Sequence, residues 1–80
     1  MERDEVKSKV IEIIAEQLGR DADSITGASD ISNDLGADSL DAAELMIAFE
    51  EAFDIDIEED NSQNLTTVDD VVDQICKQLS

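Results

Sequence analysis

Histidine is absent from this sequence of 80 residues, and cysteine occurs only once. Structural and catalytic zinc sites are built from several Cys and His ligands, so we expect no metal site, and a single Cys excludes an internal disulfide framework. General acid–base catalysis near neutral pH most often uses His, and the chain lacks this proton acceptor. The composition therefore argues against an enzyme, and we expect no catalytic residues.

Basic residues are also scarce, because 5 Lys and Arg stand against 22 Asp and Glu. They are unevenly distributed as well, since no Lys or Arg lies between Asp21 and Cys76. Such an acidic surface repels nucleic acid and anionic membranes, and it attracts partner proteins that carry basic patches. We therefore expect protein partners, with no nucleic acid and no membrane among them.

Long apolar runs are missing too. No stretch approaches the roughly 20 apolar residues that span a bilayer, and the charged segment Glu2–Glu5 gives the N-terminus no apolar export signal. A cytoplasmic protein is the simplest interpretation, and a processed organellar form stays open. A chain of this length has room for one small domain, over residues 1–80, and we expect a monomer.

Three segments instead show apolar residues at three- and four-residue spacing, which is typical of amphipathic helices. The spacing predicts helices over Asp4–Leu18, Leu40–Phe53 and Val68–Leu79. Gly19 is suited to end the first of them, because glycine readily adopts the left-handed conformation at a helix end. No strand pattern competes with these helices, so we predict an all-α fold.

A polar segment, rich in Asp, Ser and Gly, separates the first two helices. Its isolated apolar residues, Ile25 and Ile31, are expected to attach a long loop to the core. An EF-hand calcium loop beginning at Asp21 is excluded, because Thr26 occupies the required Gly position and Ser32 the required Glu. The segment is therefore predicted to be a connecting loop and not a calcium-binding site.

The second helix opens with a motif that offers a hydroxyl group to solvent. Asp38 or Ser39 is the expected N-cap, and Asp38 with Asp41 forms a variant of the capping box. A helix N-terminus tolerates a phosphate group, because its free N–H groups carry partial positive charge. With no base nearby, Ser39 is placed to be modified and not to attack. The alternative is that Ser39 is an ordinary capping residue.

The same helix carries two apolar stripes. Leu40, Ala43 and Ile47 form a narrow strip apart from the core face, and an apolar strip with an acidic rim is typical of a transient docking surface. The alternative is that Leu40 and Ile47 pack under the long loop. The acids around the strip are Glu44, Glu50 and Glu51, with Asp41 further round. The core face is expected to contain Ala42, Leu45, Met46, Phe49, Ala52 and Phe53.

The triplet Asp38, Ser39, Leu40, within the segment Leu35–Asp41, resembles the attachment motif of acyl carrier proteins of the fatty-acid type, and the resemblance extends over Val6–Leu79. It implies that a phosphopantetheinyl transferase attaches 4'-phosphopantetheine to Ser39, whose thiol then carries acyl chains as thioesters. It also implies that fatty-acid synthesis enzymes with basic patches dock on the second helix. The acids that carry over to this docking surface are Asp38, Asp41, Glu44, Glu50 and Glu51.

The resemblance also makes the expected fold more specific. It implies a small four-helix bundle with a long first loop and a short third helix over Glu58–Asn64. It further implies a core that opens for an acyl chain, although an ordinary closed core fits the sequence equally well. A specialised carrier for polyketide or aminoacyl thioesters, or an acidic adaptor without a prosthetic group, are the alternative functions. The expected pocket residues are Leu45, Met46, Phe49, Ile57, Leu65 and Val71.

Overall fold

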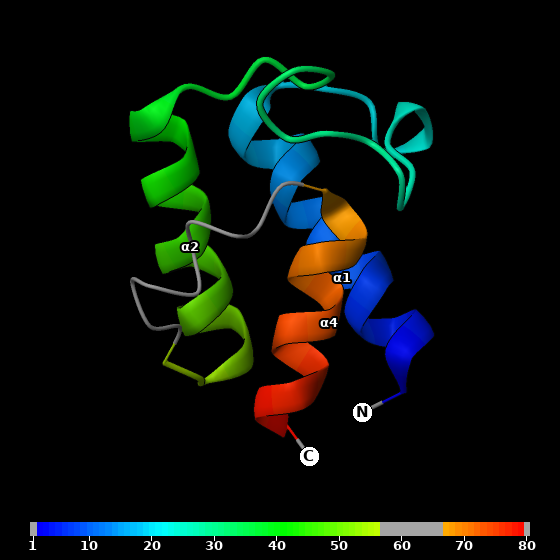
Figure 1. Ribbon diagram of the computed structural model, residues 1–80, viewed down its shortest axis with the longest axis vertical. Coiled ribbons are helices and arrows are strands. Elements are labelled where there is room, and N and C mark those ends of the chain that lie inside the picture. Colours follow the sequence, from blue (N-terminus) through cyan, green and yellow to red (C-terminus); the bar gives the residue numbers. More distant parts are fainter. Residues whose placement is uncertain (1, 57–66, 80) are drawn as a thin grey trace.

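The computed structural model describes residues 2–56 and 67–79, and all regular elements in this part of the chain are helical (Figure 1). The three long helices begin and end within one residue of the predicted bounds, which confirms the all-α class. The predicted short helix over Glu58–Asn64 lies outside the described residues, so the count of four helices is not confirmed. The elements are α1 (Arg3–Leu18), the 3₁₀ turn η1 (Ala22–Ser24), α2 (Ser39–Phe53) and α4 (Val68–Leu79).

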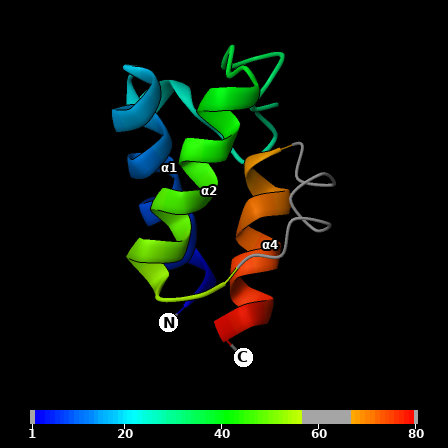
Figure 2. The same cartoon turned by 90° about the vertical axis from the view of Figure 1, so that its left-hand side faces the viewer.

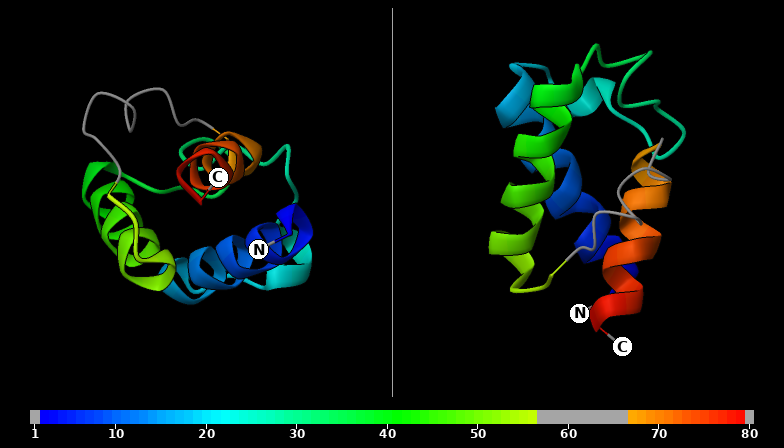
Figure 3. Two further views of the ribbon diagram at one scale, coloured as in Figure 1. Left: turned by 90° about the horizontal axis from the view of Figure 1, so that it is seen from below. Right: turned by 60° about the vertical axis from the view of Figure 1, so that its left-hand side comes forward.

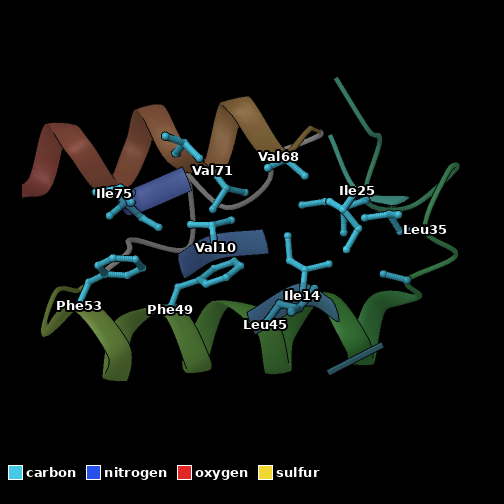
Figure 4. Close-up of a cluster of buried hydrophobic side chains, with 14 residues drawn as sticks. Val10, Ile14, Ile25, Leu35, Leu45, Phe49, Phe53, Val68, Val71 and Ile75 are labelled. Carbon is cyan, nitrogen blue, oxygen red and sulfur yellow. The ribbon is translucent and has the colours of Figure 1, made fainter. Parts of the chain in front are cut away.

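Helix α1 packs against both α2 and α4, and the three helices enclose one apolar core (Figures 3 and 4). Each helix contributes side chains spaced three or four residues apart, because that spacing puts them on one face of a helix. Phe49, in the second half of α2, is fully buried in this core. The buried residues of the helices are Val6, Val10 and Ile14 from α1, Leu45, Phe49 and Phe53 from α2, and Val68, Val71, Val72 and Ile75 from α4.

One residue of the expected core face, Ala52, was wrongly assigned, and the last apolar residue of α4 is also exposed. Ala52 is exposed, and Leu79 exposes 40% of its surface. Ala52 lies seven residues after Leu45, which turns its side chain about 20° further from the centre of the buried stripe. Leu79 is the last residue of α4, where no further turn covers it. The apolar stripe therefore narrows towards the ends of both helices.

The long connection between α1 and α2 is attached to the core as predicted. Ile25 and Ile31 are both buried. Gly19 ends α1 in the left-handed conformation, with φ of 66°, and its N–H bonds to the Ala15 carbonyl. The first loop is therefore fixed by its start and by two apolar side chains.

This loop is also hydrogen-bonded to the first turn of α4 (Figure 2). The Asp69 N–H donates to the Gly27 carbonyl at 2.9 Å, and Asp30 forms an isolated antiparallel bridge with Thr67. A Cβ on Gly27 would stand 2.4 Å from the Asp69 carboxylate. The loop and α4 approach each other closely because Gly27 has no side chain.

Ion pairs join α1 to α4 on the outside of the bundle. Arg3 pairs with Asp73, and Arg3 and Lys7 each approach Asp69 at 3.9 Å. The hydrogen bond to Asp73 raises the pKa of Arg3 above its ordinary value. All four side chains are substantially exposed, so solvent screens these pairs and their contribution to stability is small.

Candidate functional site

Ser39 is the first residue of α2, and the two neighbouring acids hold it there. The Asp38 carboxylate accepts the Asp41 N–H at 2.9 Å, and the Asp41 carboxylate accepts the Asp38 N–H at 3.4 Å. These reciprocal bonds confirm the predicted capping box. Ser39 is exposed, and α2 begins at the end of the bundle opposite the last turn of α4 (Figure 1). Its hydroxyl is accessible to a modifying enzyme.

The turn before Ser39 is anchored on both sides of a glycine. Leu35 and Ala37 are buried, and the Ala37 N–H donates to the Ile31 carbonyl at 3.0 Å. Gly36, between them, has a backbone φ of 72°, a conformation that residues other than glycine rarely adopt. The backbone therefore enters α2 along a fixed path, which orients Ser39.

A hollow of about 200 Å³ lies beside Ser39. Leu45 and Met46, two of the six expected pocket residues, line it. Phe49 and Val71 are fully buried in the core instead (Figure 4), and the remaining two, Ile57 and Leu65, lie outside the described residues. The complete lining is Ile31, Ser32, Ser39, Ala42, Ala43, Leu45 and Met46.

The second apolar strip of α2 faces solvent. Leu40 is 67% exposed and Ile47 56%, and Ala43 between them is also exposed. The alternative that Leu40 and Ile47 pack under the long loop is therefore wrong. The acids expected around this strip divide into Asp38, Glu44 and Glu51, which are exposed, and Asp41 and Glu50, which are partly buried.

Two residues near the end of α1 contact the site, and the sequence analysis did not single them out. The Gln17 side-chain amide donates to the Glu44 carboxylate at 2.8 Å, and the Arg20 Nε donates to the Leu35 carbonyl at 3.1 Å. Their partners lie 27 and 15 residues further along the chain. No pattern within one helix signals such contacts, which depend on how α1 lies against α2.

Among the described residues, the acids of the site have no cation close to them. Across residues 2–56 and 67–79, no Lys or Arg lies within 4.0 Å of a carboxylate of α2. The same residues contain no group of three or more side chains able to hold a metal ion. Nor is any helix among them both long and apolar enough to cross a bilayer. The site can present a hydroxyl group and attract basic partners.

Comparison with known proteins gives the family. Residues 8–75 match the family model described as the phosphopantetheine attachment site. The acyl carrier protein of Syntrophobacter fumaroxidans is 46% identical over 69 residues, which cover 86% of this chain and 85% of that protein. That of Porphyromonas gingivalis is 45% identical over 75 residues, covering 94% and 96%. The chain belongs to the acyl carrier protein family.

Solved structures agree with this assignment. The acyl carrier protein of Enterococcus faecalis matches with a TM-score of 0.81 and 33% identity, covering 98% of this chain and 99% of that one. The protein from Thermotoga maritima gives a TM-score of 0.83 and 32% identity, covering 99% and 92%. The described helices are therefore arranged as in solved acyl carrier proteins.

The cofactor of the family is 4'-phosphopantetheine, and the residues at the start of α2 fit it. A phosphodiester on Ser39 would meet a helix N-terminus, whose N–H groups favour negative charge. The exposed hydroxyl leaves space for a long arm, and the hollow beside it offers an apolar surface. The arm supplies a thiol, which the chain itself does not present at this end.

Proposed function

We propose that Ser39 carries the 4'-phosphopantetheine arm and that the chain transports acyl groups, bound to it as thioesters, between enzymes of fatty-acid synthesis. The observation that carries the proposal is the position of Ser39. It is exposed at the first residue of α2, inside the Asp38, Ser39, Leu40 motif of a chain that belongs to the acyl carrier protein family.

The chain's own residues present and orient the attachment point. Asp38 and Asp41 fix the start of α2 through the capping box, and the buried side chains of Leu35 and Ala37 anchor the preceding turn. The chain contains no His, the side chain that most often transfers protons near neutral pH. The carrier is therefore non-catalytic, and the chemistry belongs to the enzymes that it visits.

The docking surface is the outer face of α2. Its apolar strip is Leu40, Ala43 and Ile47, all exposed. Exposed apolar contacts hold a complex, while the surrounding acids speed encounter with basic patches on the transferase and the synthesis enzymes. The acids of this surface are Asp38, Asp41, Glu44, Glu50 and Glu51.

The acyl chain itself needs an apolar space close to the arm. The hollow beside Ser39 supports this assignment, because Leu45 and Met46 line it and the core residues Phe49 and Val71 lie deeper in the same bundle. We keep Ile57 and Leu65 in the proposed lining.

The carrier acts as one domain over residues 1–80, as a monomer in the cytoplasm, without binding nucleic acid or membranes.

The test is intact-mass spectrometry of the chain after incubation with a phosphopantetheinyl transferase and coenzyme A. The wild-type chain should gain the mass of one phosphopantetheine group, and Ser39→Ala should gain none, because the accepting hydroxyl is lost. The conservative change Ser32→Ala, in the wall of the hollow, is the matched control and should be modified normally. An adduct on Ser39→Ala, or none on the wild type, would refute the proposal.

A carrier for another thioester pathway is the second candidate. The apo doublet acyl carrier protein from prodigiosin biosynthesis matches with a TM-score of 0.82 at 25% identity, covering 94% of this chain and 36% of that one. Mass analysis of the acyl groups released from the carrier purified from its own cells separates the two. Saturated fatty acyl chains support fatty-acid synthesis, and other acids support the specialised pathway.

A further inference from the structure

Arg20 lies directly after the glycine that ends α1. Its backbone N–H bonds to the Ala15 carbonyl at 2.9 Å, so the start of the side chain is fixed to the helix end. Its guanidinium reaches across to the turn before α2, where Nε donates to the Leu35 carbonyl at 3.1 Å in a partly buried hydrogen bond. Of the described carboxylates, none lies within 4.0 Å of the guanidinium, so this contact is made to backbone and not to an acid.

The accepting carbonyl belongs to the segment that leads into Ser39. The Leu35 N–H is bonded to the Asp30 carbonyl at 3.0 Å, so Arg20 engages the opposite side of the same residue. The next residue, Gly36, lies against the guanidinium as well, because a Cβ on Gly36 would stand 3.5 Å from the Arg20 Nη2. Arg20 thus lies over a glycine turn whose flanking residues, Leu35 and Ala37, are buried and hydrogen-bonded.

We propose that Arg20 is a positioning residue for the modification of Ser39: it holds the Leu35 to Gly36 turn against the end of α1, and so holds the serine where a phosphopantetheinyl transferase can engage it. This inference rests on the proposed function of Ser39. A hydrogen bond from a charged donor to a backbone carbonyl is stronger than a neutral one. Without the Arg20 hydrogen bond, the turn spends part of its time in other conformations. The transferase then binds only the fraction of molecules in which the turn has the conformation seen here.

The direction in which the KM changes distinguishes a positioning role of Arg20 from an effect of its charge alone. Transferases that dock on an acidic carrier have basic patches, so a positive charge near the docking surface opposes encounter. If Arg20 acted only through its charge, removing it would lower the KM for the carrier. If it positions the turn, removing it raises the KM, because the apparent affinity falls with the competent fraction. The kcat should stay constant, since Arg20 does not touch the reacting hydroxyl.

The experiment compares three variants as substrates of a phosphopantetheinyl transferase with coenzyme A. Arg20→Met removes both the charge and the hydrogen bond, and Arg20→Lys keeps the charge and one donor. Lys77→Met is the matched control, because it removes one positive charge at the opposite end of the bundle (Figure 1). We expect Arg20→Met to raise the KM about five- to tenfold. Arg20→Lys should restore it to within about threefold of wild type, and Lys77→Met should leave it unchanged or lower.

Amide hydrogen exchange, measured by NMR on the unmodified chain, gives a second readout that does not depend on the transferase. The Ala37 N–H bonds to the Ile31 carbonyl and reports on the turn, whereas the Val10 and Ile14 amides report on the bundle. In Arg20→Met the Ala37 amide should exchange about tenfold faster while the two α1 amides keep their wild-type rates.

Three results would overturn the inference: a KM for Arg20→Met equal to or below that of the wild type, an unchanged Ala37 exchange rate, or equal acceleration at all three amides, which would indicate general destabilisation. Failure of the proposed function looks different, because the wild-type chain would then take up no phosphopantetheine or Ser39→Ala would take it up. The exchange measurement would still decide whether Arg20 holds the turn.

Discussion

The acids of α4 and those of α2 lie in different surroundings, although both helices are strongly acidic. Asp69 and Asp73 of α4 pair with Arg3 and Lys7 of α1. On α2, the described part of the chain has no such ion pair, and a carboxylate such as that of Glu44 bonds to a neutral amide instead. Acids close to cations support the contact between α1 and α4. Acids with no cation close by produce a negative electrostatic potential that extends into solvent and attracts basic proteins.

The apolar residues of α2 show the same division within a single helix. Leu45 and Phe49 are fully buried in the core, whereas Leu40 and Ile47 are mostly exposed. An exposed aliphatic side chain contributes little to folding and is available for binding. Helix α2 therefore has one face buried in the core and another exposed to solvent, and we propose that partners bind the exposed face.

The largest expected effect is on the free energy of unfolding, when one side chain on each of these two faces is truncated to alanine. Leu45→Ala should lower the free energy of unfolding by about 2–5 kcal/mol, because it leaves a cavity in a packed core. Ile47→Ala removes a side chain of similar size from the surface and should change it by at most about 0.5 kcal/mol. Urea denaturation followed by circular dichroism measures both. Equal losses for the two variants would show that Ile47 belongs to the core.

The next effect concerns encounter with partners. Glu44→Lys reverses a charge on the exposed face of α2 and should slow association with a basic-patched phosphopantetheinyl transferase by about five- to tenfold at low ionic strength. Glu12→Lys makes the same change on the exposed side of α1 and is the matched control. Stopped-flow association rates at low and high salt test this. Equal slowing by the two variants would mean that net charge, and not the α2 face, controls encounter.

The smallest effect compares a paired acid with an unpaired one. Asp73→Asn breaks the contact with Arg3 and should lower the unfolding temperature by about 2 °C, since exposed ion pairs contribute little. Glu51→Gln also removes one negative charge, but from an exposed position on α2, and should leave the unfolding temperature unchanged or slightly higher. Thermal scans at low salt measure both. A larger loss for Glu51→Gln would contradict the division between the two helices.

Much of this arrangement is predictable from short-range patterns. The apolar spacing gives the three helices to within one residue, and the Asp38 and Asp41 pair gives the capping box, because both depend on residues close in sequence. Ile25 and Ile31 are isolated apolar residues in a polar loop, so their burial is also predictable.

Other features depend on how the helices lie against one another, and no local pattern carries that information. The contacts of Gln17 with Glu44 and of Arg20 with Leu35 each join residues from different elements. The close approach of Gly27 to Asp69 is another example, because the glycine has an ordinary sequence environment. The role that we propose for Ser39 came from the family resemblance, since an exposed serine at a helix N-terminus is by itself most often only a cap.

The capping box sets the rotational phase of α2. A helix turns about 100° per residue, so moving its first residue by one position would rotate every side chain by more than a quarter of a turn. Asp38 and Asp41 fix that first residue through the capping box. They thereby determine which side chains of α2 face the core and which direction Ser39 faces. A one-residue insertion after Asp41 would leave the first turn in place and put Glu44 at the buried position that Leu45 now occupies.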